Sequence, residues 1–240
     1  MLWIAHGGLA GDLPAGAPDR ECLSALRARR VDRVELDVAV TATGELVVIH
    51  EAQVAPGALV EAGSLVSLRR HLPGLLTLAE AVEVLGDKAL LLDLKGSAAA
   101  PLGSWLKRRP ELQAGAAVCT DDLAALLILR HAAPAVERWR TLPTTGVGRG
   151  QRRRRALAVA GRRRLPDRLP GLVAEVAASA LCCDHLVVTA RLCAVAHRLG
   201  VPVGAWTVDR PATARRVAAA GVDLITTNAP EGMRAALREG

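Results

Sequence analysis

The 240-residue sequence predicts one α/β domain, a (β/α)8 TIM barrel with a short hairpin after its second strand. Three observations support this fold class. The length is typical of a barrel that forms a single domain. Apolar runs of strand length alternate with helical patterns, and polar residues fall at or near the ends of the runs. We therefore expect one domain over residues 1–240, with its active site at the C-terminal ends of the strands.

The expected elements follow one another in the order that a barrel requires. Strands are expected at 2–7, 33–40, 89–95, 116–120, 137–143, 180–184, 202–208 and 224–228. Helices are expected at 19–29, 77–86, 121–133, 189–199 and 210–220, with a last helix at the end of the chain. Thr77 and Glu80 have the spacing of a capping box, and Gly200 and Gly221 follow helices as C′ glycines do. The pattern is weakest over 137–180, where arginines interrupt it.

Composition excludes several classes of protein. No run of eighteen apolar residues is present, so we expect no transmembrane helix. The N-terminal stretch "MLWIAHGG" is too short for a signal peptide and lacks the basic region of one. The five cysteines are scattered and fit neither a disulfide framework nor a zinc site, which favours a cytoplasmic protein. With no Phe or Tyr and four Trp, the chain lacks an aromatic platform for nucleic-acid bases.

Positive charge is concentrated in one segment. The whole chain carries +7, but Arg149–Arg168 alone holds nine arginines and one acid, so the remainder sums to −1. The simplest interpretation is an exposed, mobile loop. The alternative is attraction to an anionic membrane surface or to phosphate. Nucleic acid is disfavoured because no nucleic-acid motif accompanies the arginines.

The stretch from Val34 to His50 combines carboxylates with a histidine. Glu35 and Asp37 lie two residues apart in a predicted strand, so they share one face. If the loop is the four residues 41–44, then Asp37 faces Val48, and Glu35 faces His50 across the hairpin. Cross-strand partners lie roughly 5 Å apart at Cβ, so this register predicts an imidazole beside two carboxylates.

A divalent cation would explain two buried carboxylates at such close range. Without one, their repulsion would raise the pKa of one of them. Mg²⁺ and Ca²⁺ prefer carboxylate oxygens, and Asp93 at the end of the third strand is the natural third ligand. Lys95 shares a face with Asp93 and can hold a phosphate oxygen as a point charge. The alternative is that Glu35 and Asp37 are solvated residues of an edge strand.

These residues carry a family resemblance. The stretches "IAHGG", "VELDVAVTATGELVVIHE", "LLTLAEAV", "LLLDLKG" and "VPVGAWTVDRPATARRVAAAGVDLITTNAPEGM" resemble the glycerophosphodiester phosphodiesterase family, outside about 100–180. The resemblance implies a (β/α)8 barrel that uses a divalent cation to hydrolyse glycerophosphodiesters, which are small-molecule phosphodiester substrates, to an alcohol and sn-glycerol 3-phosphate. It further implies that His6 and His50 act as acid and base, and that Glu35, Asp37 and Asp93 are the metal ligands. Lys95 would contact the phosphate, and Trp206 would line the pocket.

The sequence also departs from the family pattern. Gly7 stands where the family has arginine, Asp93 where it has glutamate and Glu51 where it has aspartate, and the insertion over 52–76 is short. The lost arginine and the Asp-Leu-Lys at strand three resemble the sphingomyelinase D type of phospholipase D. Two alternatives therefore stay open: a phospholipase D or lyase acting on lysophospholipids, and a barrel that binds substrate without turnover.

Overall fold

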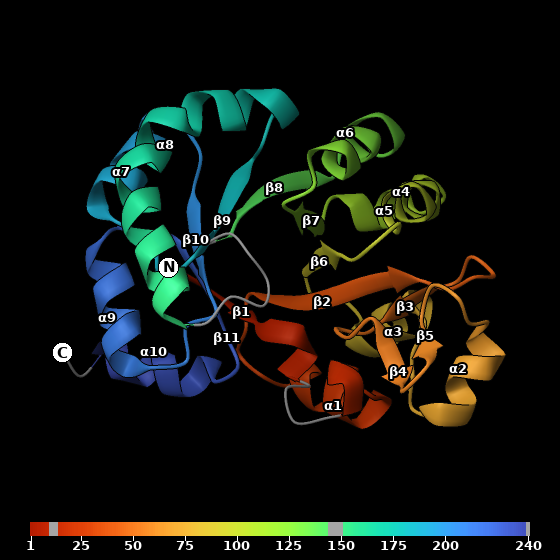
Figure 1. Ribbon diagram of the computed structural model, residues 1–240. Coiled ribbons are helices and arrows are strands. Elements are labelled where there is room, and N and C mark those ends of the chain that lie inside the picture. The colour runs from red at the N-terminus through yellow and green to blue at the C-terminus, as the bar shows by residue number, and fades with distance from the viewer. Residues whose placement is uncertain (10–13, 144–150, 239–240) are drawn as a thin grey trace. The chain divides into compact units, whose positions relative to one another are not determined.

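The structure is a computed structural model that describes residues 1–9, 14–143 and 151–238 (Figure 1). The chain forms two compact units. The first, called the N-terminal unit, is Ala5–Val136; the second, the C-terminal unit, is Met1–Ile4 together with Glu137–Gly240. All the acidic and histidine residues of the predicted site lie in the N-terminal unit, and Trp206 lies in the C-terminal unit.

The N-terminal unit is built on a sheet with the strand order β7-β6-β2-β3. The strands β2, β6 and β7 are parallel, and β3 returns antiparallel to β2. The strands are β2 (Arg33–Val40), β3 (Leu46–Val48), β4 (Gln53–Ala55), β5 (Ala58–Leu59), β6 (Leu90–Leu94) and β7 (Ala116–Thr120). The α-helices are α1 (Arg20–Arg27), α2 (Leu65–His71), α3 (Leu78–Leu85), α4 (Ala99–Lys107), α5 (Pro110–Gln113) and α6 (Leu123–Ala132). Two 3₁₀ turns, η1 (His6–Leu9) and η2 (Pro14–Gly16), precede α1.

Side-chain alternation along β2 separates a core face from a functional face. Leu36 and Val38 are fully buried and join one hydrophobic cluster with apolar residues of α1, α3 and α4. Burying a side chain of this size stabilises the fold by about 1.5–3 kcal/mol. Because successive residues point to opposite faces, Glu35 and Asp37 are left on the face turned away from these helices.

The C-terminal unit repeats the strand–helix alternation. Its strands have the order β8-β9-β10-β11-β1, and β8 through β11 are parallel. They are β1 (Leu2–Ala5), β8 (Glu137–Leu142), β9 (Ala180–Asp184), β10 (Val203–Trp206) and β11 (Leu224–Thr227). The helices are α7 (Gln151–Val176), α8 (Ala190–Arg198), α9 (Pro211–Ala219) and α10 (Pro230–Arg238). Apolar residues of all four helices pack with the strands in one cluster.

The eight predicted strands are confirmed, as are the five located helices and the capping box of Thr77 and Glu80. The interpretation of the arginine-rich segment as a loop is wrong from residue 151 onward, because that part belongs to α7. Residues 149 and 150 lie outside the described residues. Two prolines and two glycines disfavour a helix here. Burial of Ala158 and Leu169 in the C-terminal core accounts for the helix, since packing outweighs propensity.

The predicted register of the β2–β3 hairpin is wrong by one residue. Val38 pairs with Val48 and Val40 with Leu46, and the Ile49 N–H donates to the carbonyl oxygen of Asp37 at 3.0 Å. The loop has three residues instead of four, because the Thr41 N–H donates to the Glu45 carbonyl oxygen (2.9 Å) and extends the ladder. A shift of one residue turns a side chain to the opposite face, so Glu35 does not face His50 across the hairpin.

Two other expectations concern membranes and cysteines. Among the described residues no helix combines the length and the apolar character needed to cross a bilayer. All five cysteines lie in the described ranges and are free thiols. The expectation of one domain over the whole chain stays a prediction.

Candidate active site

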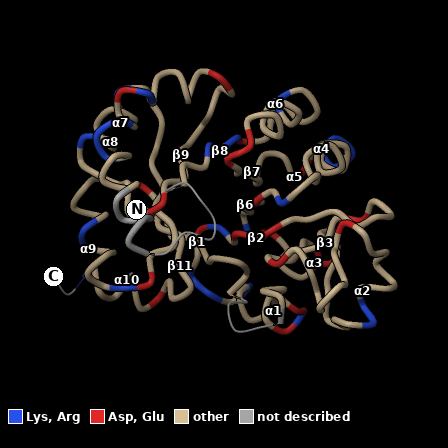
Figure 2. Tube along the Cα trace, in the orientation of Figure 1, with Lys and Arg blue, Asp and Glu red and all other residues tan. Residues whose placement is uncertain are grey.

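Three carboxylates gather where β2 and β6 pair, and acidic positions are coloured along both strands in Figure 2. Asp37 and Asp93 are register partners in the parallel pair, and Glu35 lies two residues earlier on the same face. One ligand oxygen from each of the three lies within 4.8 Å of the others. Glu35 and Asp37 are buried, while the Asp93 side chain keeps 27 % of its surface exposed. The cluster is therefore open on the Asp93 side, as a metal site accessible to substrate must be.

Lys95 provides positive charge at this cluster. Its Nζ lies 2.8 Å from Oδ1 of Asp37 and 2.7 Å from Oδ2 of Asp93. Desolvation acts to lower the pKa of Lys95, but attraction to Asp93 and Asp37 outweighs it, and the pKa is raised above its usual value. Lys95 is therefore charged at neutral pH, as a phosphate contact must be.

Burial and mutual repulsion nevertheless disfavour the charged forms of Glu35 and Asp93. Burial, followed by repulsion from Asp37 and Asp93, raises the pKa of Glu35 well above its usual value. Burial likewise raises the pKa of Asp93, and the attraction of Lys95 only partly opposes the shift. A hard divalent cation would relieve this repulsion, and three carboxylates are a donor set that suits it. The structure thus brings together the ligands that the sequence predicted, and they fit a cation.

The turn that begins at His6 contacts the cluster through its backbone. The Gly7 N–H donates to Oε2 of Glu35 at 2.5 Å. Gly7 has φ +53°, a conformation that glycine adopts without strain, and a Cβ at this position would lie 3.8 Å from Oδ2 of Asp37. His6 is therefore anchored next to the carboxylates by its neighbour in the chain.

His50 is positioned by the segment that follows His6, not by the hairpin. The chain leaves β3 after Val48, and the Glu51 N–H donates to the Ala15 carbonyl oxygen at 3.1 Å. A Cβ on Gly16 would come within 2.8 Å of the His50 Cβ, so only glycine permits this packing. Nδ1 of His50 lies 3.1 Å from Oε1 of Glu51, and 49 % of the histidine side chain is exposed.

Trp206 is described within the C-terminal unit. It ends β10 and pairs in register with Asp184 of β9. Its indole Nε1 is buried, and no hydrogen-bond partner for it is found in the described part of the chain. A buried donor without a partner is unfavourable by about 1–3 kcal/mol. That Trp206 lines the substrate pocket stays a prediction.

Two acidic residues of the site region were not predicted. Glu51 was noted only as a departure from a family pattern, yet it holds the ring of His50. Glu61 lies in the insertion and accepts hydrogen bonds from Ser97, two residues after Lys95. For Glu51, its position directly after a candidate catalytic histidine was an available signal. No local pattern in the sequence indicates Glu61, because its partner is 36 residues away.

The fold was compared with known proteins. No family model and no curated protein sequence matches the chain. Among solved structures, a candidate glycerophosphoryl diester phosphodiesterase from Silicibacter pomeroyi has a TM-score of 0.80 and 24 % identity, over 100 % of this chain and 93 % of its own. A phosphodiesterase from Oleispira antarctica, in complex with the product sn-glycerol-3-phosphate, has a TM-score of 0.76 and 18 % identity, over 99 % and 97 %. A glycerophosphodiester phosphodiesterase from Parabacteroides distasonis has a TM-score of 0.76 and 21 % identity, also over 99 % and 97 %.

At these identities the similarity establishes the architecture. Strands alternate with helices in both units, with β2, β6 and β7 parallel in the N-terminal unit and β8 to β11 parallel in the C-terminal unit, and the match to these structures extends over the whole chain. The predicted fold class is confirmed: this chain has the (β/α)8 TIM-barrel fold that is found in solved glycerophosphodiester phosphodiesterases.

Proposed function

We propose that the protein is a metal-dependent phosphodiesterase that hydrolyses glycerophosphodiesters to an alcohol and sn-glycerol 3-phosphate. The observation that carries the proposal is the cluster of Glu35, Asp37 and Asp93 with Lys95 between two of its members. Asp37 and Asp93 lie toward the C-terminal ends of the paired stretches Val34–Val38 and Leu90–Leu94, and enzymes of this fold place their active sites at the C-terminal ends of the strands. The solved structure that contains sn-glycerol-3-phosphate supports the choice of substrate class.

The three carboxylates would hold one divalent cation, Mg²⁺ or Ca²⁺. Such an ion, when bound, neutralises charge on the non-bridging phosphate oxygens. The ammonium group of Lys95 is held beside this ion site, because it lies at hydrogen-bond distance from Asp37 and Asp93. From there it would bind a further phosphate oxygen. Together these residues bind and orient the phosphate.

His6 and His50 would divide the proton transfers between them. One takes a proton from the attacking water, and the other protonates the leaving alkoxide on the opposite side. Glu51 orients His50 by holding Nδ1, which leaves Nε2 free to exchange a proton with a reacting oxygen. Trp206, at the end of β10, would line the substrate pocket.

The test is a pair of matched substitutions. Asp37→Asn keeps the shape of a buried ligand but removes its charge, and Asp87→Asn makes the same change at an exposed position of the same unit. We expect Asp37→Asn to abolish release of sn-glycerol 3-phosphate and to weaken Mg²⁺ and Ca²⁺ binding measured by calorimetry. Asp87→Asn should match the wild type. Normal turnover by Asp37→Asn in a chelator would refute the metal-dependent reaction.

A second reaction is favoured by the missing arginine at Gly7 and by the Asp93-x-Lys95 pattern. It is cleavage of a lysophospholipid by a phospholipase D or lyase, in which water or the substrate's own hydroxyl attacks phosphorus and the head group leaves. Product analysis distinguishes it from the first reaction, because the phosphodiesterase releases sn-glycerol 3-phosphate, whereas the second reaction releases the head group and leaves a phosphomonoester lipid or a cyclic phosphate. Substrate binding without any product, at any metal concentration, would identify a barrel that no longer turns over.

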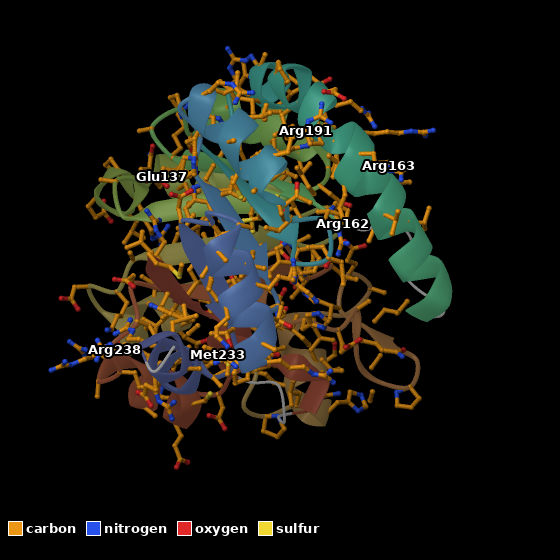
Figure 3. All side chains as sticks on the ribbon, turned by 90° about the vertical axis from the view of Figure 1, so that its left-hand side faces the viewer. Glu137, Arg162, Arg163, Arg191, Met233 and Arg238 are labelled. Atoms are coloured by element: carbon orange, nitrogen blue, oxygen red, sulfur yellow. The ribbon has the colours of Figure 1, made fainter. Side chains whose placement is uncertain are left out.

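The further proposal is that the protein acts in the cytoplasm and is attracted to anionic membranes through Arg149–Arg168. Basic positions lie along α7 in Figure 2, and Figure 3 labels Arg162 and Arg163 of this helix and Arg191 of α8. Arg191 pairs with Asp167, the segment's single acid, at 2.6 Å. Replacing Arg152 to Arg155 by serine should reduce binding to anionic vesicles at low salt and leave hydrolysis of a small diester unchanged. Unchanged vesicle binding would contradict the membrane proposal.

A further inference from the structure

The insertion between β3 and α3 folds onto the strand face that carries the carboxylates. Residues 52–72, called the β4–α2 segment, contain β4, β5 and α2 and lie beside β3 (Figure 1). Val60 and Leu68 of this segment are buried in a cluster with Ala39 of β2 and Val47 of β3. Ala39 follows Asp37 on the same face of β2. The segment therefore covers this face directly beyond the acidic cluster.

Glu61 connects the β4–α2 segment to the turn after β6. Its Oε1 accepts a hydrogen bond from the backbone N–H of Ser97 at 2.9 Å and one from the Ser97 hydroxyl at 3.1 Å. Ser97 lies just before α4, whose N-cap, Ala98, makes no capping hydrogen bond with its side chain. A carboxylate near the start of a helix is favourable because the N–H groups there lack partners in the helix. Glu61 supplies this carboxylate from another part of the chain.

Gly96 leaves space for this contact. A Cβ built on Gly96 would lie 2.0 Å from Oε1 of Glu61, which is far inside any contact distance, and its φ is +50°. Every residue other than glycine would therefore displace the carboxylate or move the turn. Gly96 separates Lys95 from Ser97, so the contact between Glu61 and Ser97 lies two residues from Lys95 along the chain.

The turn Lys95–Ala98 is consequently held from two directions. On one side the Lys95 N–H donates to the Val38 carbonyl oxygen of β2 at 2.9 Å. On the other side Glu61 holds Ser97, and within the turn the Ala98 N–H donates to the Lys95 carbonyl oxygen at 3.3 Å. These bonds fix the backbone from which the Lys95 ammonium reaches Asp37 and Asp93.

We propose that Glu61 is a positioning residue, which acts through Ser97 to hold the Lys95 ammonium against the phosphate site. The inference rests on the proposed function, because it assigns to Lys95 a phosphate oxygen as its ligand. Glu61 itself does not contact the substrate or the cation. Loss of Glu61 should weaken binding of the substrate's phosphate group and leave the affinity for the metal ion nearly unchanged.

The experiment compares Glu61→Ala, Glu61→Gln, Gly96→Ala and the double variant Glu61→Ala/Gly96→Ala. Glu83→Gln is the control, since Glu83 is an exposed acid of α3 in the same unit. We expect Glu61→Ala to lower kcat/KM for a glycerophosphodiester about tenfold, chiefly through KM, because small displacements of a positioned group reduce rates by such factors. Glu61→Gln keeps an acceptor oxygen and should recover part of the loss. Affinity for Ca²⁺ should change less than about twofold, because Glu61 is not a ligand.

Gly96→Ala should reproduce the loss, because its Cβ displaces Glu61. In the double variant the carboxylate is already absent, so only the backbone strain of alanine at φ +50° remains, and adding Gly96→Ala to Glu61→Ala should lower kcat/KM less than Gly96→Ala does alone. Losses that multiply in the double variant would show that the two residues act separately, and this would overturn the proposal. Amide exchange at Ser97, measured by NMR, reports the contact itself and should accelerate in both single variants.

The readouts separate failure of the inference from failure of the proposed function. Faster exchange at Ser97 with unchanged kcat/KM would make Glu61 a purely structural contact and overturn the inference alone. If the wild type hydrolyses no glycerophosphodiester, the proposed function fails. Binding of inorganic phosphate to the Ca²⁺-loaded protein then replaces kcat/KM. Equal phosphate affinity of wild type and Glu61→Ala would overturn the inference, and about tenfold weaker binding by the variant would support it.

Discussion

Lys95→Met should reveal how the site tolerates three carboxylates without a metal. At an effective dielectric constant of about 20, the charges of Lys95 and Asp37, 2.8 Å apart, attract by about 6 kcal/mol. Two carboxylate oxygens at 4.8 Å repel by about 3–4 kcal/mol on the same basis. Methionine keeps the apolar stem of lysine but removes the charge, so the repulsion is left without its internal counter-charge.

Most of the gross attraction is offset by desolvation. Removing one partner of a buried ion pair is unfavourable by about 3–5 kcal/mol, and because 32 % of the Lys95 side chain is exposed we take the lower limit, about 3 kcal/mol. For a chain of this size that lowers Tm by about 6–12 °C in a chelator. Saturating Mg²⁺ or Ca²⁺ should return much of this loss, because the ion supplies the missing positive charge.

Calorimetry and thermal unfolding measure the two effects separately. The variant should bind Ca²⁺ at least about tenfold more tightly, equivalent to about 1.4 kcal/mol, because a competing positive charge is gone. Its kcat/KM should fall by about 10- to 100-fold, since a charged hydrogen bond to phosphate is lost. Weaker Ca²⁺ binding, or an unchanged Tm in chelator, would refute the assignment of Lys95 as counter-charge to the cluster.

The remaining predictions concern Glu35 and the two histidines. The pKa of Glu35 is raised in the fold, so its contribution to stability is complete below about pH 4, the range of an unfolded carboxyl, and is lost as pH rises through the folded pKa. In chelator, the Tm of Glu35→Gln should therefore increasingly exceed that of wild type between pH 5 and 8; a difference that is independent of pH would contradict the shift. His6→Ala and His50→Ala should each lower kcat by about 10²–10⁴-fold. The double variant should lose much less than the product of both, and fully multiplicative losses would argue against concerted proton transfer.

The strands and the acidic cluster were predictable because both depend on short-range pattern. Alternation along β2 assigns Glu35 and Asp37 to one face, and parallel pairing brings Asp93 next to Asp37. The hairpin register was not predictable from loop length alone, because Thr41 extends the ladder. One added pair moved His50 away from Glu35, and its position depends instead on packing against Gly16.

Other features depend on contacts between distant parts of the chain. Helix α7 forms despite Pro166 and Pro170, because its apolar residues are buried against a core contributed by the rest of the C-terminal unit. The contact between Glu61 and Ser97 joins an insertion to a strand end, and neither stretch alone contains its signal. Trp206 was placed at a strand end correctly, but the absence of a partner for its indole N–H among the described residues is visible only in three dimensions.

The space left by Gly96 makes two positions of the chain interdependent in evolution. A mutation that adds a side chain at 96 must adopt φ +50° and also meets the carboxylate of Glu61, so a residue able to adopt that conformation is tolerated only where residue 61 is already shorter. The reverse order is open, because loss of Glu61 leaves Gly96 without a clash. Substitutions at the two positions should therefore accumulate in a fixed order, first 61 and then 96. Among homologues, a larger residue at 96 should occur only together with a small residue at 61.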